Sequence, residues 1–317
     1  MRQANQAENL SGDLAGVVAQ LELTTVVGKV QSTHWAAATE PGMELQVGTV
    51  TVEVVEVLHG GAKLHSGDAL EVPAKRAASA NVRAHNRVNY WNALRLNPND
   101  LLLFACRPTQ EPRVCKAVAG RHISSSTADD VQAMRKAYEI EEFSGDGVQR
   151  RKLLAAALQS NLDLLSRYAL DYLDRHVSTD RDSAVQLLHD AIIAPSATSG
   201  RRLNFALAMT GQGYLVRDRK ADAANQIIVG SLATALVNES DFETRATLAR
   251  ILASAVLMEF SPDAKEAAKI SFALVHSPQC PPPPRVISVL SEIIGQSGGD
   301  QREMLSRLLK TWQTTGS

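Results

Sequence analysis

The sequence predicts a two-domain α+β protein in which a small β-barrel precedes a stacked array of helices. Residues 20–125 are rich in Val and Thr, and their apolar side chains alternate with polar ones, which is the period of a half-buried strand. After Ser124 the apolar positions recur every three or four residues, as they do on one face of a helix. With 317 residues, 44% of them hydrophobic, the chain is long enough for two cores.

The change of period sets the predicted domain boundaries. We expect an N-terminal tail over 1–19, the barrel over 20–125, a linker helix over 126–146 and helical repeats over 147–317. The 33 Lys and Arg nearly balance the 34 Asp and Glu, so the chain as a whole has no electrostatic bias toward nucleic acid or membranes.

The start of the chain, MRQANQAENLSGDLAG, lacks the apolar core of a secretory signal. No run in the sequence approaches the roughly 20 apolar residues that a membrane span needs. The sequence therefore predicts a cytoplasmic protein without a membrane span. Export is the alternative, because a chain that begins after a removed leader has the same kind of start.

Five strands are expected in the first domain, the first two being LTTVVGKV (23–30) and GTVTVEVVEVLHGG (48–61). In the second of these, Val54 and Val55 are adjacent apolar residues. This slip in the alternation predicts a β-bulge or the strong coiling that a small closed barrel needs. DALEV (68–72) is a short third strand, and DLLLFAC with RVCKAVA forms the closing hairpin.

Two cysteines lie on this hairpin. If FACRPTQEPRVC turns at Gln110 and Glu111, Cys106 stands directly opposite Cys115. Opposed residues of an antiparallel pair have Cα atoms about 4.5 to 5.5 Å apart, which is within the reach of a disulfide. The favoured interpretation is nevertheless that both cysteines stay reduced and fill a small core, as expected of a cytoplasmic protein.

Amphipathic helices are expected to recur about every 20 residues after the barrel. Thr127 with Asp130 forms a capping-box-like start for the linker helix. Further helix starts are expected at Ser261 and at Asp300. Two segments place apolar residues at i, i+3, i+4, i+7 and i+8: Ala184, Leu187, Leu188, Ala191 and Ile192 in one, and Leu248, Ile251, Leu252, Ala255 and Val256 in the other.

The helices are expected to pair into repeats. We count about nine of them between residues 147 and 314, which gives units of roughly 40 residues, a spacing typical of helical repeats. No helix can bury its apolar stripe alone, so the pattern favours stacking into a curved α-solenoid. A compact bundle is the alternative.

Four segments of the barrel carry a resemblance to a known family. VVGKV, GTVTVEVVEVLHGG, SGDALEV and LNPNDLLLFACRP resemble a barrel domain of many bacterial proteins, related to the tissue-inhibitor-of-metalloprotease and netrin-like branch of the oligonucleotide/oligosaccharide-binding (OB) fold. The helical part is similar to HEAT-like repeats. The resemblance implies an OB-like β-barrel followed by a HEAT-like α-solenoid. Inhibition of metalloproteases is not implied, because that activity uses an N-terminal cysteine and no cysteine precedes Cys106.

The sequence contains no motif of a common enzyme class. GxxxxGKS, strand-linked GxGxxG, a GxSxG elbow after a strand and HExxH are all absent; GQSGG at 295–299 has the GxSxG spacing but lies where only helices are expected. Gly211 and Gly213 in TGQGY follow a helix, whose C-terminus repels phosphate, so they are interpreted as a helix stop. His59 and His65, taken with the hairpin cysteines, match no recurrent zinc spacing and are expected to be solvated turn residues. We predict no metal and no cofactor.

A basic and aromatic stretch between the third strand and the closing hairpin is the candidate binding surface. Basic grooves with aromatic platforms hold single strands in OB domains. The favoured alternative is structural: Tyr90, Trp91, Leu94 and Leu96 form an apolar cluster that caps the barrel or docks on the first helices. A protein partner is the third reading. The candidate residues are Lys75, Arg76, Arg83, Arg87, Tyr90, Trp91 and Arg95.

Two other charged groups are expected to be solvated: the acidic end of the linker helix, with Glu139, Glu141 and Glu142, and a basic rim that includes Arg201 and Arg202. The sequence as a whole predicts a non-enzymatic interaction or scaffold protein, whose helical surface binds a protein partner and whose barrel is a second recognition element. Binding of single-stranded nucleic acid through residues 75–95 is the alternative.

Overall fold

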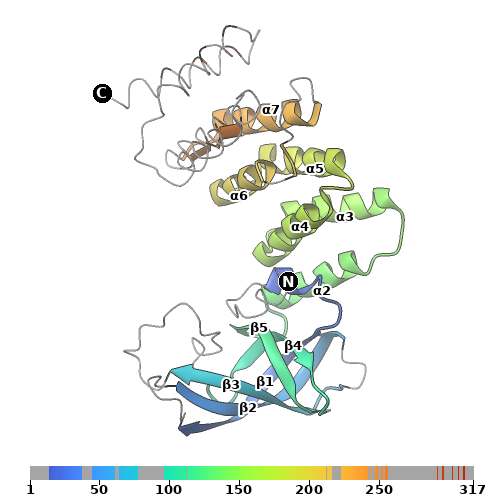
Figure 1. Ribbon diagram of the computed structural model, residues 1–317, viewed down its shortest axis with the longest axis vertical. Helices are drawn as coiled ribbons and strands as arrows, with labels where there is room; N and C mark the ends of the chain where they lie inside the picture. Colours follow the sequence, from blue (N-terminus) through green and yellow to red (C-terminus); the bar gives the residue numbers. More distant parts are fainter. Residues whose placement is uncertain are drawn as a thin grey trace. The chain divides into compact units, whose positions relative to one another are not determined.

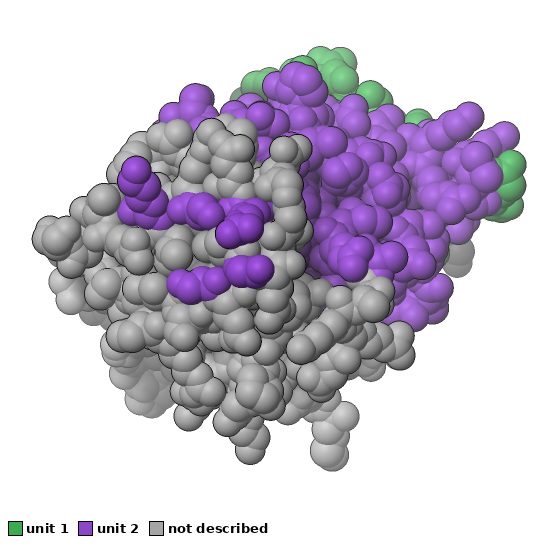
Figure 2. All heavy atoms as spheres, turned by 90° about the horizontal axis from the view of Figure 1, so that it is seen from above, with its two compact units in different colours: residues 1–146, 160–171 green, residues 147–159, 172–317 purple. Residues whose placement is uncertain are grey.

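The computed structural model describes residues 14–37, 45–60, 64–77, 96–111, 113–211, 213–215 and 223–241, with isolated positions from 244 to 310. These residues form a mixed α+β protein, with one five-stranded antiparallel sheet followed by helices (Figure 1). The predicted change from strands to helices near residue 125 is confirmed. The chain divides into two compact units, coloured separately in Figure 2: residues 1–146 with 160–171, and residues 147–159 with 172–317.

The strands of the first unit are β1 (Thr24–Ala37), β2 (Leu45–His59), β3 (Ala69–Ala77), β4 (Leu101–Pro108) and β5 (Cys115–Ile123). They hydrogen-bond in the order β3-β2-β1-β4-β5, and all neighbours are antiparallel. The third strand continues to Ala77, beyond its predicted end at residue 72.

The sheet is not closed by a ladder between its two edge strands. Among the described residues, one isolated parallel bridge joins Glu71 of β3 to Val114, the residue just before β5. At this bridge the Glu71 N–H donates to the Arg113 carbonyl over 2.7 Å. In place of the closed barrel expected from the sequence, the described residues therefore form an open sheet whose edges are joined by one backbone bridge.

A β-bulge in β2 confirms the predicted slip of alternation. Val27 pairs with Glu56 and Gly28 pairs with Val54, so Val55 has no partner in the register. An extra residue on one strand increases the local twist, which helps the sheet to curl. Gly28 lies at the bulge because a Cβ there would overlap Cγ1 of Val52 and lie 3.1 Å from the Phe104 ring.

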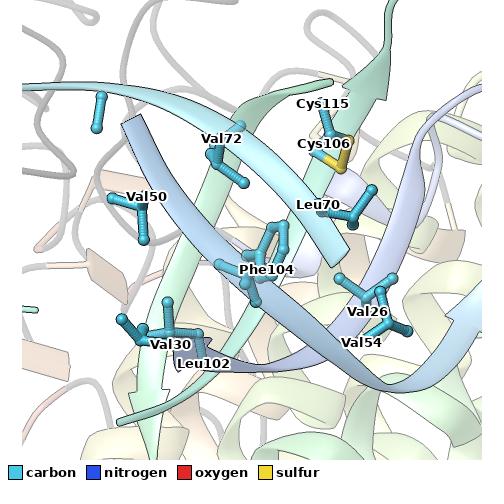
Figure 3. Packing of buried hydrophobic residues seen from close by; sticks show 13 residues of the cluster. Val26, Val30, Val50, Val54, Leu70, Val72, Leu102, Phe104, Cys106 and Cys115 are labelled. Carbon is cyan, nitrogen blue, oxygen red and sulfur yellow. A yellow bond between two sulfur atoms is a disulfide. The ribbon is translucent and has the colours of Figure 1, made fainter. Parts of the chain in front are cut away.

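Alternate residues of the strands build the core of the sheet. Val50, Val52 and Val54 are fully buried, whereas Thr51 and Glu53 between them are partly exposed. Burial of each such apolar side chain contributes about 1.5 to 3 kcal/mol. All three belong to one core cluster, and Figure 3 shows Val50 and Val54 converging with residues of the other strands, among them Val26, Val30, Leu70, Val72, Leu102 and Phe104.

Two helices of the first unit contact this sheet. The short α1 (Leu14–Val17) contacts β4 and β5, and α2 (Asp129–Glu141) contacts β2. The predicted capping box is wrong, because the N-cap of α2 is Ala128 and no side chain caps it. Asp130 instead accepts a hydrogen bond of 2.9 Å from Arg121 of β5.

The later helices are α3 (Gly147–Gln159), α4 (Asp163–His176), α5 (Arg181–Ile193), α6 (Ser199–Met209) and α7 (Ala223–Asn238). In the second unit, α5 contacts α3, α6 and α7. Its predicted stripe is confirmed, since the five residues of that stripe are all buried, as is Val185 beside them. Leu248, Ile251, Leu252 and Ala255 of the second predicted stripe are also buried.

Gly211 and Gly213 follow the end of α6 as expected, and Gly213 adopts a φ of +98°, which favours glycine. The helix starts predicted at Ser261 and Asp300, and the side chain of Val256, lie outside the described residues.

We expect Gly28→Ala to lower the free energy of unfolding by about 1 to 3 kcal/mol, because the new methyl group must displace Val52 or bend β1. Urea-induced unfolding of the full chain measures this. Gly230→Ala on α7 is the control: its Cβ meets nothing within 4 Å, and replacing a helical glycine should stabilise by about 0.5 to 1 kcal/mol. Equal stability of Gly28→Ala and the wild type would contradict the packing at the bulge.

Candidate functional site

The structure describes little of the predicted binding stretch. Lys75 and Arg76 lie on β3, where their backbones pair with Val47 and Gln46 of β2. Their side chains lie outside the described residues, as do the other five candidates, Arg83, Arg87, Tyr90, Trp91 and Arg95. Leu96 is described, and it packs against the core of the sheet, as the structural interpretation of the apolar cluster expects for this residue.

The outer face of β1, β2 and β3 carries more negative than positive charge among its described side chains. Glu71 is exposed on β3 and pairs in register with Thr51, and Glu53 pairs with Lys29. The Gln31 amide donates to Glu53 on the same face. Two carboxylates and one ammonium group do not form the basic groove that a phosphate backbone requires.

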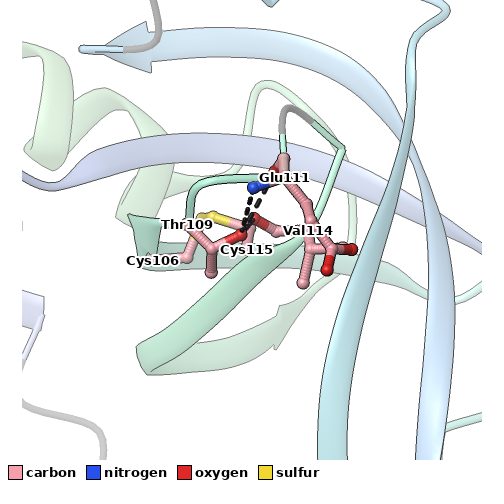
Figure 4. The surroundings of a disulfide bond; sticks show 5 residues. All are labelled: Cys106, Thr109, Glu111, Val114 and Cys115. Atoms are coloured by element: carbon pink, nitrogen blue, oxygen red, sulfur yellow. Dashed lines mark hydrogen bonds between the residues drawn. A yellow bond between two sulfur atoms is a disulfide. The ribbon is translucent and has the colours of Figure 1, made fainter.

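The hairpin cysteines are joined in a disulfide, with Cα atoms 5.7 Å apart (Figure 4). The sequence favoured reduced cysteines with the disulfide as the other possibility, and the structure has the disulfide. The predicted register is wrong, however. The last pair before the turn is Pro108 with Cys115, so Cys106, two residues earlier, pairs with Ala117. The two cysteines are therefore diagonal neighbours on one face of the hairpin.

The turn beside the disulfide is organised by one hydroxyl group. Oγ1 of Thr109 lies 2.9 Å from the Val114 carbonyl oxygen and 3.1 Å from that of Glu111. It also accepts a hydrogen bond of 3.2 Å from the Glu111 N–H (Figure 4). These contacts fix the segment that carries Val114 to the bridge with β3.

A polar cluster, here called the α2 seam, lies where α2 packs on β1 and β2. It consists of Thr25, Glu56, His59, Arg135, Tyr138 and Glu142. The His59 ring stacks on the Tyr138 ring, with centroids 4.3 Å apart and planes 8° from parallel. Its Nδ1 lies 2.7 Å from Glu142 Oε1 and its Nε2 lies 3.1 Å from the Leu21 carbonyl oxygen.

The geometry of His59 favours a structural role over a catalytic one. Both ring nitrogens face oxygen acceptors, so neither is open to a metal ion or a substrate proton. The expectation of a solvated turn histidine is wrong for His59, whose side chain is only 11% exposed, whereas His65 is 80% exposed as expected.

Tyr138 and Arg135 hold α2 to the strands. The Tyr138 hydroxyl is 2.7 Å from Thr25 Oγ1. Burial raises the pKa of Tyr138 to about 12; the bond to Thr25 opposes this rise, and the nearby carboxylates of Glu142 and Glu141 add to it. Arg135 contacts both carboxylate oxygens of Glu56.

The acidic end of α2 is only partly solvated. Glu139 is exposed, as expected, but Glu142 pairs with His59 and Glu141 accepts a hydrogen bond of 2.7 Å from the Tyr168 hydroxyl. A signal for this was present in the sequence: Arg135, Tyr138 and Glu142 follow the i, i+3, i+7 spacing of one helix face. No comparable signal marks Thr25, Glu56 or His59 on the strands.

A second polar cluster surrounds Glu239, just after α7. Its buried carboxylate accepts hydrogen bonds from the Ser199 hydroxyl at 2.9 Å, the Asp241 N–H at 2.9 Å and the Arg202 guanidinium at 3.1 Å. Burial raises the pKa of Glu239, but these three donors outweigh it and hold the pKa below its ordinary value. The expected solvated rim is wrong for Arg202, whose side chain is 12% exposed.

The described histidines of the helices have ordinary packing roles. His176 stacks on Tyr172, and His189 lies 2.8 Å from the Ser231 hydroxyl. In the described part of the chain, no three His, Cys, Asp or Glu side chains gather in a group able to hold a metal ion. No helix among those residues is both long enough and apolar enough to cross a bilayer.

We expect the stability of the wild type to fall between pH 10 and pH 12. The folded pKa of Tyr138 is raised above its ordinary value of 10.0, so its contribution is complete below pH 10 and is lost as the pH rises toward 12. Over this pH range, the free energy of unfolding of Tyr138→Phe should fall by on the order of 2 kcal/mol less than that of the wild type. Urea unfolding at each pH measures the difference. Superimposable pH profiles of the two proteins would contradict the burial of this hydroxyl.

At neutral pH, Tyr138→Phe should cost about 1 kcal/mol, because the Thr25 hydroxyl loses its partner. The double variant Thr25→Val/Tyr138→Phe removes both polar groups and should cost less than the sum of the two single changes. Additive costs would mean that the two hydroxyls do not interact.

We expect Glu239→Gln to lower the free energy of unfolding by about 3 kcal/mol at pH 7, because Arg202 stays buried without its counter-charge. The lowered pKa of Glu239 means that the wild type gains this stability above pH 4.5 and loses it as the pH falls further. The variant should therefore approach the wild type in acid. Glu139→Gln, at an exposed position, is the matched control and should change stability by under about 0.5 kcal/mol.

Comparisons with known proteins identify no relative of this chain. No family model, no curated protein and no solved structure matches this chain. Any assignment of function therefore depends on the strand order, helix contacts and side-chain chemistry described above.

Proposed function

We propose that this chain is a non-enzymatic interaction protein, in which a HEAT-like array of helices supplies the main binding surface and an OB-like barrel is a second recognition element. The observation that carries the proposal is the contact pattern of α5. This helix contacts its chain neighbour α6 and also α3 and α7, each two helices away.

That pattern supports a repeat stack. In a helical-repeat protein each unit buries its stripe against the units before and after it, so alternate helices touch along one layer. The stripe of α5 is buried in this way, while Gln186 and Asp190 on the same helix remain exposed. A stack of this kind presents an extended surface, and such surfaces mostly bind other macromolecules.

The strand order supports an OB-like barrel in the first unit. An OB fold is a five-stranded, partly open Greek-key barrel. The order β3-β2-β1-β4-β5, with a parallel contact between β3 and β5, agrees with this topology. The single bridge at Glu71 is consistent with a barrel that is only partly closed.

The charges on the barrel favour a protein partner over nucleic acid. OB domains commonly bind oligonucleotides on the face that includes their second and third strands. Glu53 and Glu71 lie on that face here and would repel phosphates. Nucleic-acid binding remains the alternative through the basic stretch 75–95, whose side chains would have to supply all of the positive charge.

The proposal is tested by site-specific photo-crosslinking of the full chain in the cells that make it. A photoreactive residue replaces Val148 on α3 or Leu207 on α6, which are 54% and 44% exposed; Leu21, which is 50% exposed in the first unit, is the matched control. We expect one protein to crosslink from both helical positions. With that protein purified, Leu207→Glu should weaken its binding by roughly tenfold or more and Leu21→Glu should not.

Two results would contradict the proposal. One is the absence of any crosslink that both helical positions share. The other is oligonucleotide binding with a steep salt dependence that is lost in Arg83→Ala and Trp91→Ala, which would favour the nucleic-acid alternative.

A further inference from the structure

The disulfide occupies a particular place in the sheet. Cys106 is fully buried on β4 and Cys115, the first residue of β5, is 3% exposed. Figure 3 shows both in the core, in the same cluster as Leu70 and Val72 of β3. The bond therefore crosslinks the interior of the first unit rather than a surface loop.

This bond lies next to the backbone bridge that joins the edges of the sheet. Val114, which bridges to Glu71, directly precedes Cys115, and the Arg113 carbonyl accepts the hydrogen bond from Glu71. Thr109 fixes the other side of the same turn. A crosslink between Cys106 and Cys115 limits the freedom of this segment and so keeps Val114 in place against β3.

We infer that the Cys106–Cys115 disulfide is a structural crosslink of the native protein, that it holds the edges of the sheet together, and that the protein works in an oxidising compartment. This inference is independent of the proposed binding function.

The chemistry of the bond supports the assignment of the compartment. Disulfides persist in oxidising compartments and are rare in the cytosol, where thioredoxin and glutathione keep thiols reduced. When the bond forms, the two thiols of Cys106 and Cys115 lose two protons and two electrons. A disulfide-carrying oxidoreductase accepts them by thiol–disulfide exchange, and its own disulfide becomes a dithiol.

The competing hypothesis is that the protein is cytoplasmic, which is the location first expected from the sequence. In that compartment the two cysteines would remain thiols, and the contact between β3 and β5 would depend on the backbone bridge and the apolar core without the covalent bond. The two accounts differ in the redox state of two named residues, which is directly measurable.

The first measurement is a thiol-trapping experiment in the cells that naturally make the protein. Cells are quenched in acid, free thiols of the denatured full chain are blocked with one maleimide, and the remaining cysteines are reduced and labelled with a second. We expect Cys106 and Cys115 to carry only the second label in peptide mass spectrometry. The first label on both residues would overturn the inference.

The second measurement tests the structural role with purified full chain. Closing a ten-residue loop predicts that reductant lowers the Tm of the wild type by roughly 5 to 10 °C. The double variant Cys106→Ala/Cys115→Ala should have a low Tm that reductant does not change. Cys280→Ser, which removes the third cysteine, should respond to reductant as the wild type does. An unchanged Tm in wild-type chain shown to be fully reduced would overturn the structural role.

Discussion

The fold of the first unit depends on one geometric constraint, the curling of a five-stranded sheet until its edge strands meet. The core residues of β2 and β3 can be shielded from water only if β4 and β5 come round to cover them. The extra residue Val55 adds twist to β2, and Gly28 lets β1 approach it closely. The curl ends at the bridge between Glu71 and Val114, beside the disulfide.

The docking of α2 shows how polar groups are accommodated in such a packed interface. Burying a hydroxyl or a charge without a partner is costly, so each polar group of the α2 seam faces another. Tyr138 meets Thr25, Arg135 meets Glu56, and His59 lies between a carboxylate and a carbonyl. The Glu239 cluster of the second unit follows the same rule with three donors around one carboxylate. The polar residues of the α2 seam and of the Glu239 cluster therefore hold helices and strands in position.

The features that could be predicted from the sequence are those that depend on the spacing of apolar residues within one segment. The alternation of Val50, Val52 and Val54, the bulge after them and the stripe of α5 all follow from residues close together in the chain. The sequence did not predict contacts between distant segments. The pairing of His59 with Glu142 joins residues 83 positions apart, and nothing in either neighbourhood indicates the other.

The hairpin illustrates the same limit at short range. A two-residue turn at Gln110 and Glu111 would place Cys106 opposite Cys115, but the observed turn leaves Pro108 opposite Cys115, so Cys106 pairs with Ala117. Register depends on the packing of the whole sheet, which a twelve-residue pattern does not contain. For the candidate binding site, the side chains of residues 75–95 lie outside the described residues, so the role of this stretch stays a prediction.

The meeting of the sheet edges is tested most directly by hydrogen exchange at the Glu71 amide of the full chain, followed by NMR with and without reductant. The account predicts a protected amide in the oxidised protein, because it donates to the Arg113 carbonyl, and exchange at least tenfold faster after reduction. Amides within α5 should keep their protection. Exchange of the Glu71 amide at the rate of an unstructured peptide in the oxidised protein would contradict the account.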